Sequence, residues 1–261
     1  MNNTVYAFLM TLVAGLSTGI GSLIALFAKN KNTKFLSFAL GFSAGIMIYI
    51  STIEIFPKAK LSLCEFMGDK NGLIVVSVSF FIGILLIALI DKLIPQKTLN
   101  FNNSPDEEGR KKIMRMGLFT AAAISMHNLP EGLATFLTAL KEPTIATPVV
   151  AAIAIHNIPE GIAVSAPIYY ATKSRKKAFV YSFLSGLTEP LGAVIGYLLL
   201  MPFLNDAIFG IAFSAVAGIM VYISIDTLLP TAEEYGEHSL SVKGAVLGMA
   251  VKAASLILFA G

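Results

Sequence analysis

The sequence is poor in charged residues, cysteine and histidine, and it has no tryptophan. Only 13% of its 261 residues are charged. That is about half the share found in soluble domains, so a soluble globular protein is excluded. The single cysteine, Cys64, excludes an intrachain disulfide and a zinc cluster built from cysteines. The net charge of +3 is small for a nucleic-acid-binding protein, so we expect no nucleic-acid partner.

What remains is strongly apolar, with 56% hydrophobic residues. They form runs of about 20 residues, the length of helix that crosses a bilayer. A backbone in lipid must satisfy its own hydrogen bonds, which favours helices. We therefore predict an all-α integral membrane protein, with eight transmembrane helices in a single domain over residues 1–261. The predicted spans are 5–27, 35–56, 73–94, 116–139, 146–170, 178–201, 207–229 and 243–260.

The basic residues are unevenly distributed between the connectors. Most of the 19 Lys and Arg residues fall in or beside the segments 29–34, 95–115 and 172–177. Connectors rich in Lys and Arg stay in the cytoplasm, so 95–115 is predicted as a cytoplasmic loop and both termini lie outside. The first apolar run has no basic residue before Lys29, so it lacks the start of a signal peptide and is expected to be retained. These features indicate a multi-pass protein of the cell membrane.

Two pairs of segments repeat within the chain. AGIMIYIS at 44–51 recurs as AGIMVYIS at 217–224, and each is followed six residues later by a proline. GLSTGIG at 15–21 resembles GLTEPLG at 186–192 more weakly. In the predicted topology these repeats run in opposite directions, which is typical of secondary transporters with a binding site at the membrane midplane.

A third repeat lies between these halves, where HNLPEG at 127–132 recurs as HNIPEG at 156–161. The two hexapeptides fall near the centres of neighbouring spans, which gives the chain a 3+2+3 arrangement of helices. Polar and ionisable groups at that depth are costly unless they face one another, water or an ion. One histidine in a membrane helix is often only a helix-to-helix hydrogen bond, but two copies of this motif are hard to explain as packing.

The spacing within the first hexapeptide places its polar groups around a small volume. His127 and Glu131 are four residues apart and share a helix face. Asn128 lies about 100° further round the helix. Pro130 cannot donate a backbone hydrogen bond, which frees a carbonyl oxygen beside the histidine, and Gly132 allows close helix approach.

The second hexapeptide repeats this arrangement with His156, Asn157 and Glu160, and its Gly161 corresponds to Gly132. A third helix adds Glu189, which we expect to complete the site. Imidazole with carboxylate suits Zn²⁺, Fe²⁺, Mn²⁺, Co²⁺ and Cd²⁺, whereas the absence of thiolates argues against Cu⁺. The bound ion is expected to be a substrate, in competition with protons, and no cofactor is predicted.

Three other polar residues stay open between two interpretations. Glu54 and Asp226 lie at the ends of the second and seventh predicted spans. They are interpreted either as ligands at the entrance and exit of the pathway or as interfacial anchors. His238 is either a metal acceptor or part of a solvated acidic loop. Lys252 is unusual within the last span and is expected to snorkel or to pair with an acid.

At HNLPEG, HNIPEG and SGLTEPLG the sequence resembles the ZIP family of metal-ion transporters, most closely its bacterial ZupT-type branch. The resemblance extends over the whole chain, with its eight spans, outside termini and 3+2+3 plan. It implies uptake of metal into the cytoplasm and a homodimer. It also implies a primary metal position at His127, Glu131, His156 and Glu160, and an adjacent one at Asn128, Asn157 and Glu189. Many members carry a histidine-rich loop before the fourth span, but residues 95–115 contain no histidine.

Rival functions fit the residues less well. Two G-x-S-x-G segments, at 15–19 and 41–45, leave an intramembrane serine protease open, but both lie in helix stretches and would leave the paired glutamates unexplained. The chain has no H-E-x-x-H motif and no Walker motif, which argues against a zinc protease and an ATP-driven pump. We therefore predict a protein that is not an enzyme. A metal channel or a metal exporter stays open, because direction rests on the resemblance alone.

Overall fold

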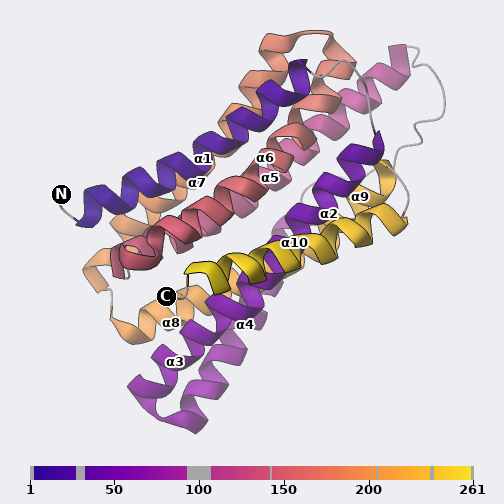
Figure 1. The fold of residues 1–261 in the computed structure, drawn as a ribbon. Coiled ribbons are helices and arrows are strands. Elements are labelled where there is room, and N and C mark those ends of the chain that lie inside the picture. Colours follow the sequence, from indigo (N-terminus) through magenta and orange to yellow (C-terminus); the bar gives the residue numbers. More distant parts are fainter. Residues whose placement is uncertain are drawn as a thin grey trace.

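The computed structural model describes residues 3–27, 33–92, 107–141, 143–203, 205–235 and 238–259, and it contains helices and no strand over this part of the chain (Figure 1). The longest elements are α1 (Asn3–Phe27), α2 (Thr33–Tyr49), α4 (Asp69–Asp91), α5 (Glu107–Lys141), α6 (Pro143–Thr172), α7 (Arg175–Leu200), α8 (Asp206–Ile223) and α10 (His238–Phe259). Two short helices, α3 (Phe56–Met67) and α9 (Leu229–Tyr235), continue α2 and α8 through the π-helical segments η1 (Ile50–Ile55) and η3 (Ser224–Leu228). A 3₁₀ turn, η2 (Met201–Phe203), follows α7.

Seven of the described helices are long and apolar enough to cross a membrane. They are Asn3–Leu26, Ser37–Met67, Asp69–Ile90, Ala146–Thr172, Arg175–Leu199, Asp206–Glu234 and His238–Ile257. The remaining long helix, α5, is not among the seven; its first turns are charged and its middle holds the HNLPEG motif. The all-helical membrane class is therefore confirmed, while the eight-span 3+2+3 arrangement stays a prediction.

Several helices extend beyond their predicted limits. Residues 57–67 were expected in a connector but form most of α3, and the chain reverses at Gly68, whose φ of 84° suits glycine. Part of the predicted cytoplasmic loop 95–115 is also helical, because α5 begins at Glu107; residues 93–106 lie outside the described part of the chain. Apolar runs locate the membrane-crossing centre of a helix, not the polar turns that prolong it.

The π-helical segments explain how the chain passes its two repeated prolines. Pro57 and Pro230 lack the N–H that an α-helix requires. Just before each proline, a backbone N–H donates to a carbonyl five residues earlier, from Phe56 to Ser51 and from Leu229 to Ser224. Both serine hydroxyls also donate to a carbonyl four residues earlier, at 2.7 Å.

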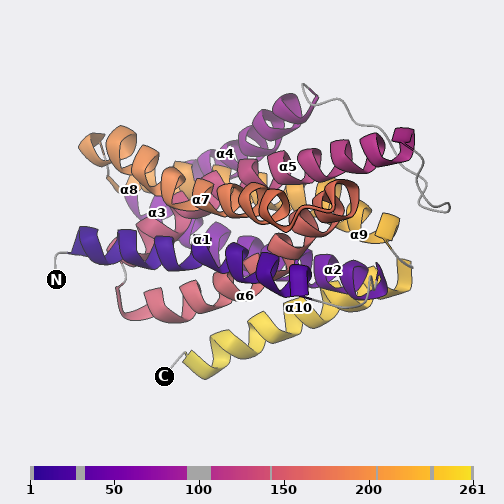
Figure 2. The same ribbon diagram turned by 90° about the horizontal axis from the view of Figure 1, so that it is seen from above.

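The repeats run in opposite directions in space. From α2 to α3 the chain runs toward the end of the bundle where the termini lie, and from α8 to α9 it runs away from that end (Figures 1 and 2). Within the bundle α1 packs against α6, α5 against α7, α2 against α10 and α4 against α8. The termini share one end of the molecule (Figure 2).

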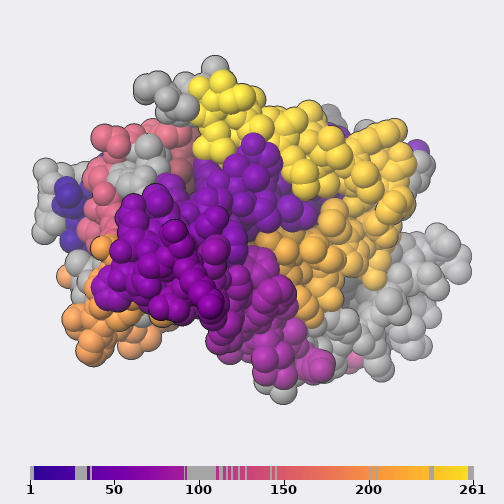
Figure 3. Space-filling view, turned by 90° about the horizontal axis from the view of Figure 1, so that it is seen from below, coloured from indigo at the N-terminus to yellow at the C-terminus, as the bar shows by residue number. Residues whose placement is uncertain are grey.

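The outer surface of the bundle is apolar. In Figure 3 the helices of residues 33–91 and the yellow α10 form much of one face. On α4 the side chains of Phe81, Ile82 and Leu85 are all exposed. Such a surface suits hydrocarbon and not water. Among the described side chains of the repeated motifs, Asn128, Glu131, His156, Asn157 and Glu160 are instead buried, on α5 and α6.

Candidate metal centre

The two hexapeptides meet through a histidine and a glutamate. His156 Nε2 on α6 lies 2.7 Å from Glu131 Oε1 on α5, and the two side chains are 0% and 2% exposed. The other ring nitrogen of His156 lies 3.2 Å from the Ala152 carbonyl oxygen, one turn earlier on α6. A histidine held in this way keeps Nε2 directed at the carboxylate, which is the geometry of an oriented ligand.

Glu160 is the second buried carboxylate of the pair of motifs. It lies four residues after His156 on α6, and its Oε1 accepts a hydrogen bond of 3.0 Å from the hydroxyl of Ser43 on α2. Both side chains are buried. The carboxylate is therefore oriented by a helix outside the motif pair.

The asparagines of the two motifs face different neighbours. Asn157 Nδ2 donates to Glu189 Oε2 on α7 at 2.7 Å and to the Ala14 carbonyl on α1 at 3.1 Å. Asn128 Nδ2 donates to the Ser185 carbonyl on α7 at 3.0 Å. Both amide groups thus use their N–H donors on surrounding helices and keep their Oδ1 atoms for another donor or a cation.

These groups form one electrostatic cluster. The charges of Glu131 and Glu160 both act on His156, and the same two carboxylates act on Glu189. Several of the buried oxygens accept no hydrogen bond from the described residues: Glu131 Oε2, Glu189 Oε1, Asn128 Oδ1 and Asn157 Oδ1. Buried acceptors without a donor call for water or an ion. The donor set of imidazole, carboxylate and amide oxygen suits a divalent transition metal.

In the described part of the chain no three His, Cys, Asp or Glu side chains are assembled as a ready-made metal site. Glu131, Glu160 and Glu189 each contact a protein partner, namely His156, Ser43 and Asn157. Metal binding would replace some of these contacts. His127 lies on α5, but its side chain is outside the described part, so its role as a ligand stays a prediction.

The motif glycines bring neighbouring helices into backbone contact. A Cβ at Gly132 would overlap the carbonyl oxygen of Glu189, and a Cβ at Gly161 would overlap that of Thr18 on α1. The expectation that both glycines allow close helix approach is therefore confirmed. Gly132 packs the first motif against the third helix of the cluster, and Gly161 packs the second motif against α1.

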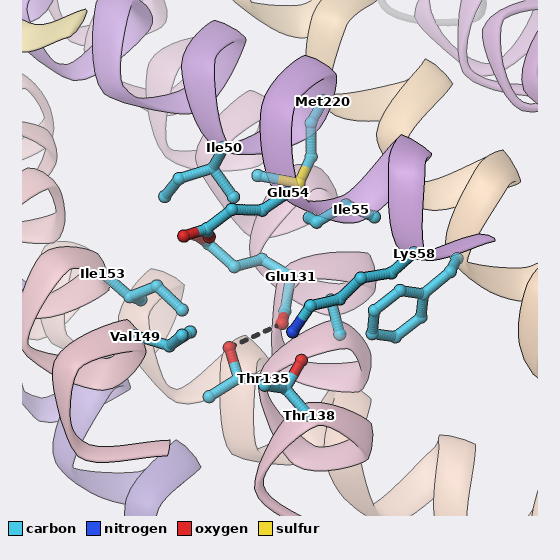
Figure 4. A pocket seen from close by; sticks show the side chains of 12 residues that line it. Ile50, Glu54, Ile55, Lys58, Glu131, Thr135, Thr138, Val149, Ile153 and Met220 are labelled. Carbon is cyan, nitrogen blue, oxygen red and sulfur yellow. Dashed lines mark hydrogen bonds between the residues drawn. The ribbon is translucent and has the colours of Figure 1, made fainter. Parts of the chain in front are cut away.

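A narrow pocket opens beside Glu131 (Figure 4). Glu54 and Lys58, from η1 and α3, line it together with Glu131 and with Thr135 and Thr138 of α5. It leaves about 20 Å³ for solvent, roughly the space that one water molecule needs. The buried cluster therefore borders a small polar opening.

Sequence reasoning missed Ser43 as a partner of Glu160, because Ser43 was considered only within a protease motif. One signal was available: within the copied segments FSAGIM and AVAGIM, Ser43 corresponds to Val216. A polar residue that occurs in only one of two repeated helices indicates a specific interaction in that half of the molecule.

The structure also shows the surroundings of the four other polar residues that the sequence singled out. Glu54 pairs with Lys252 at 2.9 Å, which confirms the expected acid partner of the lysine. Asp226 is exposed on η3. His238 Nδ1 lies 2.6 Å from Glu233 Oε1, and both side chains are exposed. This exposure favours the interpretation as a solvated acidic segment.

The contacts of the motif serines and of His156 disfavour a serine protease. Both nitrogens of His156 face Glu131 and the Ala152 carbonyl. Ser17 donates to the Ala14 carbonyl, and Ser43 donates to Glu160. Neither motif serine therefore has His156 as its base.

Known proteins resemble this chain over nearly its whole length. The sequence model of the ZIP zinc transporter family matches residues 96–255. The chain is 60% identical to "Zinc transporter ZupT" of Streptococcus mutans over 97% of both chains. It is 59% identical to the protein of that name from Chlorobium chlorochromatii over 99% of both. Identity to the one from Oceanobacillus iheyensis is 56% over the full length of both. The chain therefore belongs to the ZIP family of zinc transporters, in its ZupT-type branch.

Proposed function

We propose that this protein moves Zn²⁺ across the cell membrane into the cytoplasm, and that it also accepts Fe²⁺, Mn²⁺, Co²⁺ and Cd²⁺ as substrates. The observation that carries the proposal is the buried contact between Glu131 and His156 across α5 and α6, with Glu160 and Glu189 in the same electrostatic cluster. Charged groups at this depth mark ion pathways in membrane proteins. The names of the relatives, which are zinc transporters, agree with this substrate class.

The proposed ligands fall into two groups. His127, Glu131, His156 and Glu160 form the primary position, and Asn128, Asn157 and Glu189 form an adjacent one. The chemistry of the first group is nitrogen and oxygen donation to a borderline cation. The second group has oxygen donors only, because an amide presents its lone pairs on oxygen. The N–H groups of both asparagines are directed at backbone carbonyls or at Glu189.

In this proposal, binding of the metal ion replaces contacts within the protein by contacts with the ion. In the described arrangement His156 Nε2 lies 2.7 Å from Glu131 Oε1, and this close approach of two buried polar groups limits the cost of burying them without a metal. An incoming divalent cation takes Nε2 and Oε1 as ligands and ends their direct contact. Ser43 and Asn157 keep Glu160 and Glu189 oriented during this exchange, because each is bonded to only one oxygen of its carboxylate.

The proposed topology places both termini outside the cytoplasm, with α5 as the remaining span and with a homodimer as the assembled form. Uptake is then movement from the side of the termini toward the connectors rich in Lys and Arg. Lys173 and Arg175, in one of those connectors, are exposed at the end of α6 and the start of α7.

The test is metal flux in liposomes that contain the purified protein and a metal-sensitive dye. We expect saturable entry of Zn²⁺ and of the other transition metals, and no entry of Mg²⁺, because imidazole ligands disfavour that ion. Glu160→Gln should abolish entry, and the matched change at an exposed glutamate of α3, Glu65→Gln, should leave it intact. Entry that does not saturate with metal concentration would identify a channel. Flux only from the cytoplasmic side to the outer side would identify an exporter. No flux in folded wild type would refute transport.

A further inference from the structure

A lysine that is not one of the proposed metal ligands lies buried within α10. Lys252 is 1% exposed, and its Nζ lies 2.9 Å from Glu54 Oε1, whose side chain is 13% exposed. An ammonium group inside a membrane protein is costly and persists only with a partner. Nothing in the proposed coordination of the metal requires this pair, so the pair is available for a different function.

Glu54 lies in the wall between two pockets. Three residues line both of them, Glu54, Lys58 and Val149. On one side is the narrow pocket of about 20 Å³, with Glu131 and Thr138 in its lining. On the other is a wide pocket of about 350 Å³, with Lys252 and Ser255 in its lining. A path from the wide pocket to Glu131 therefore passes the carboxylate of Glu54.

The position of Glu54 on the backbone supports movement of this wall. Glu54 lies in the π-helical segment η1, and such segments are frequent at functional sites. Figure 4 shows its side chain extending into the pocket that Glu131 also lines. The same carboxylate thus contacts Lys252 of the wide pocket and belongs to the wall of the narrow one.

We propose that the Glu54–Lys252 ion pair is a latch between the two pockets, and that a divalent cation opens it by displacing the Lys252 ammonium from Glu54. A divalent ion carries twice the charge of the ammonium group, so it competes for the carboxylate at the same distance. Lys252 stays tethered to α10 and pairs again with Glu54 once the ion has moved on toward Glu131. This latch rests on the proposed transport of divalent cations.

Thiol labelling measures the latch without any metal. The chain has one cysteine, so Cys64→Ser provides a background without thiols. Thr138→Cys then reports access to the narrow pocket, and Ser255→Cys reports access to the wide one. Purified protein in detergent is treated with methyl methanethiosulfonate, which removes any dependence on membrane orientation.

Breaking the latch should expose only the narrow pocket. We expect Lys252→Met and Glu54→Gln to raise the labelling rate at Thr138→Cys by about tenfold or more, the effect of losing roughly one strong charge-assisted contact. Lys252→Arg keeps the cation and should label like the parent. Labelling at Ser255→Cys should stay the same throughout. If one single variant fails to fold, the double variant Glu54→Gln/Lys252→Met, which leaves no unpaired charge, replaces it with the same expectation.

Zinc flux provides the second measurement. Without the tethered competitor, an ion binds Glu54 more tightly and leaves it more slowly, so Lys252→Met should lower KM and kcat together, each by about tenfold. Equal labelling at Thr138→Cys in all variants, in a wild type that transports zinc, would overturn the latch and leave the proposed function standing. A wild type that carries no metal, but whose labelling follows the latch variants, would refute the transport proposal and leave a gate between the pockets.

Discussion

His156 Nε2 on α6 lies 2.7 Å from Glu131 Oε1 on α5, and both side chains are buried. The contact joins the two copies of the repeated hexapeptide through ionisable side chains. Because the histidine and the carboxylate are also ligand types that transition metals prefer, we propose that the same two atoms become ligands when an ion is bound. This alternation relates the described arrangement to the proposed loaded state.

Removing the charge of Glu131 should disable metal uptake. Glu131→Gln keeps the size of the side chain but replaces a carboxylate oxygen with a nitrogen that carries two hydrogens. We expect zinc uptake into liposomes to fall by at least about tenfold, since loss of even a ligand's supporting contact commonly costs that much.

The matched control is Glu65→Gln, the same chemical change at an exposed position of α3. It should transport like wild type. Undiminished uptake by Glu131→Gln, in protein that elutes as a folded species, would remove Glu131 from the ligand set.

Ser43 should tune affinity more than turnover. Ser43→Ala deletes the hydroxyl that donates to Glu160 Oε1, so the carboxylate loses its orientation but keeps its charge. We expect the KM for zinc to rise by about tenfold, with kcat changed less. Uptake kinetics over a range of zinc concentrations measures both constants.

Ser37→Ala provides the comparison for that experiment, because Ser37 is also buried on α2 but is hydrogen-bonded to none of the described residues. Equal kinetic effects of the two alanine variants would show that the Ser43 result reflects α2 as a whole and not its bond to Glu160.

Gly132 should be intolerant of any side chain. A Cβ there would overlap the Glu189 carbonyl, so Gly132→Ala forces α5 and α7 apart. Overpacking of this kind costs about 1–3 kcal/mol, which corresponds to a decrease in Tm of roughly 2–12 °C. Thermal unfolding in detergent measures it. Ala151→Val, which enlarges an exposed position on α6, should leave Tm nearly unchanged; an equal decrease there would contradict the specific role of the crossing.

The Glu54–Lys252 pair should show strong coupling in stability. Lys252→Met leaves the carboxylate of Glu54 without its cation, which we expect to cost about 3–5 kcal/mol of unfolding free energy. Glu54→Gln/Lys252→Met should recover most of that loss, since no charge is left unpaired. Additive effects of the two single changes in a double-mutant cycle would mean that the residues do not interact.

Much of the helical plan was predictable, because apolar runs and the two hexapeptides have strong periodic or repeated signals. The copied AGIM segments also indicated equivalent structure in both halves, and η1 and η3 lie at corresponding places. The π-helical form of these segments was not predicted. It depends on how each helix accommodates the missing N–H of a proline, and this is decided by packing as much as by sequence.

The residues of the candidate site were proposed from the sequence, but the contacts among them were not predicted. The motif spacing identified Glu131 and His156, but not that they contact each other directly, because that depends on how α5 and α6 are rotated. Ser43 and Lys252 lie far in the chain from their partners, at helix faces that only the packed bundle brings together. The extension of α5 and of α3 into predicted connectors likewise reflects packing of polar turns that have no apolar signal.

The most direct test of the central claim is X-ray absorption of zinc bound to the purified protein. The chain has three histidines, so His238→Ala first removes the exposed one. The account predicts zinc surrounded by nitrogen and oxygen ligands only, at about 2.0–2.2 Å. It also predicts an imidazole contribution that decreases when His156→Ala is added. A shell that contains sulfur, or one that His156→Ala leaves unchanged, would contradict a metal site built on the Glu131–His156 contact.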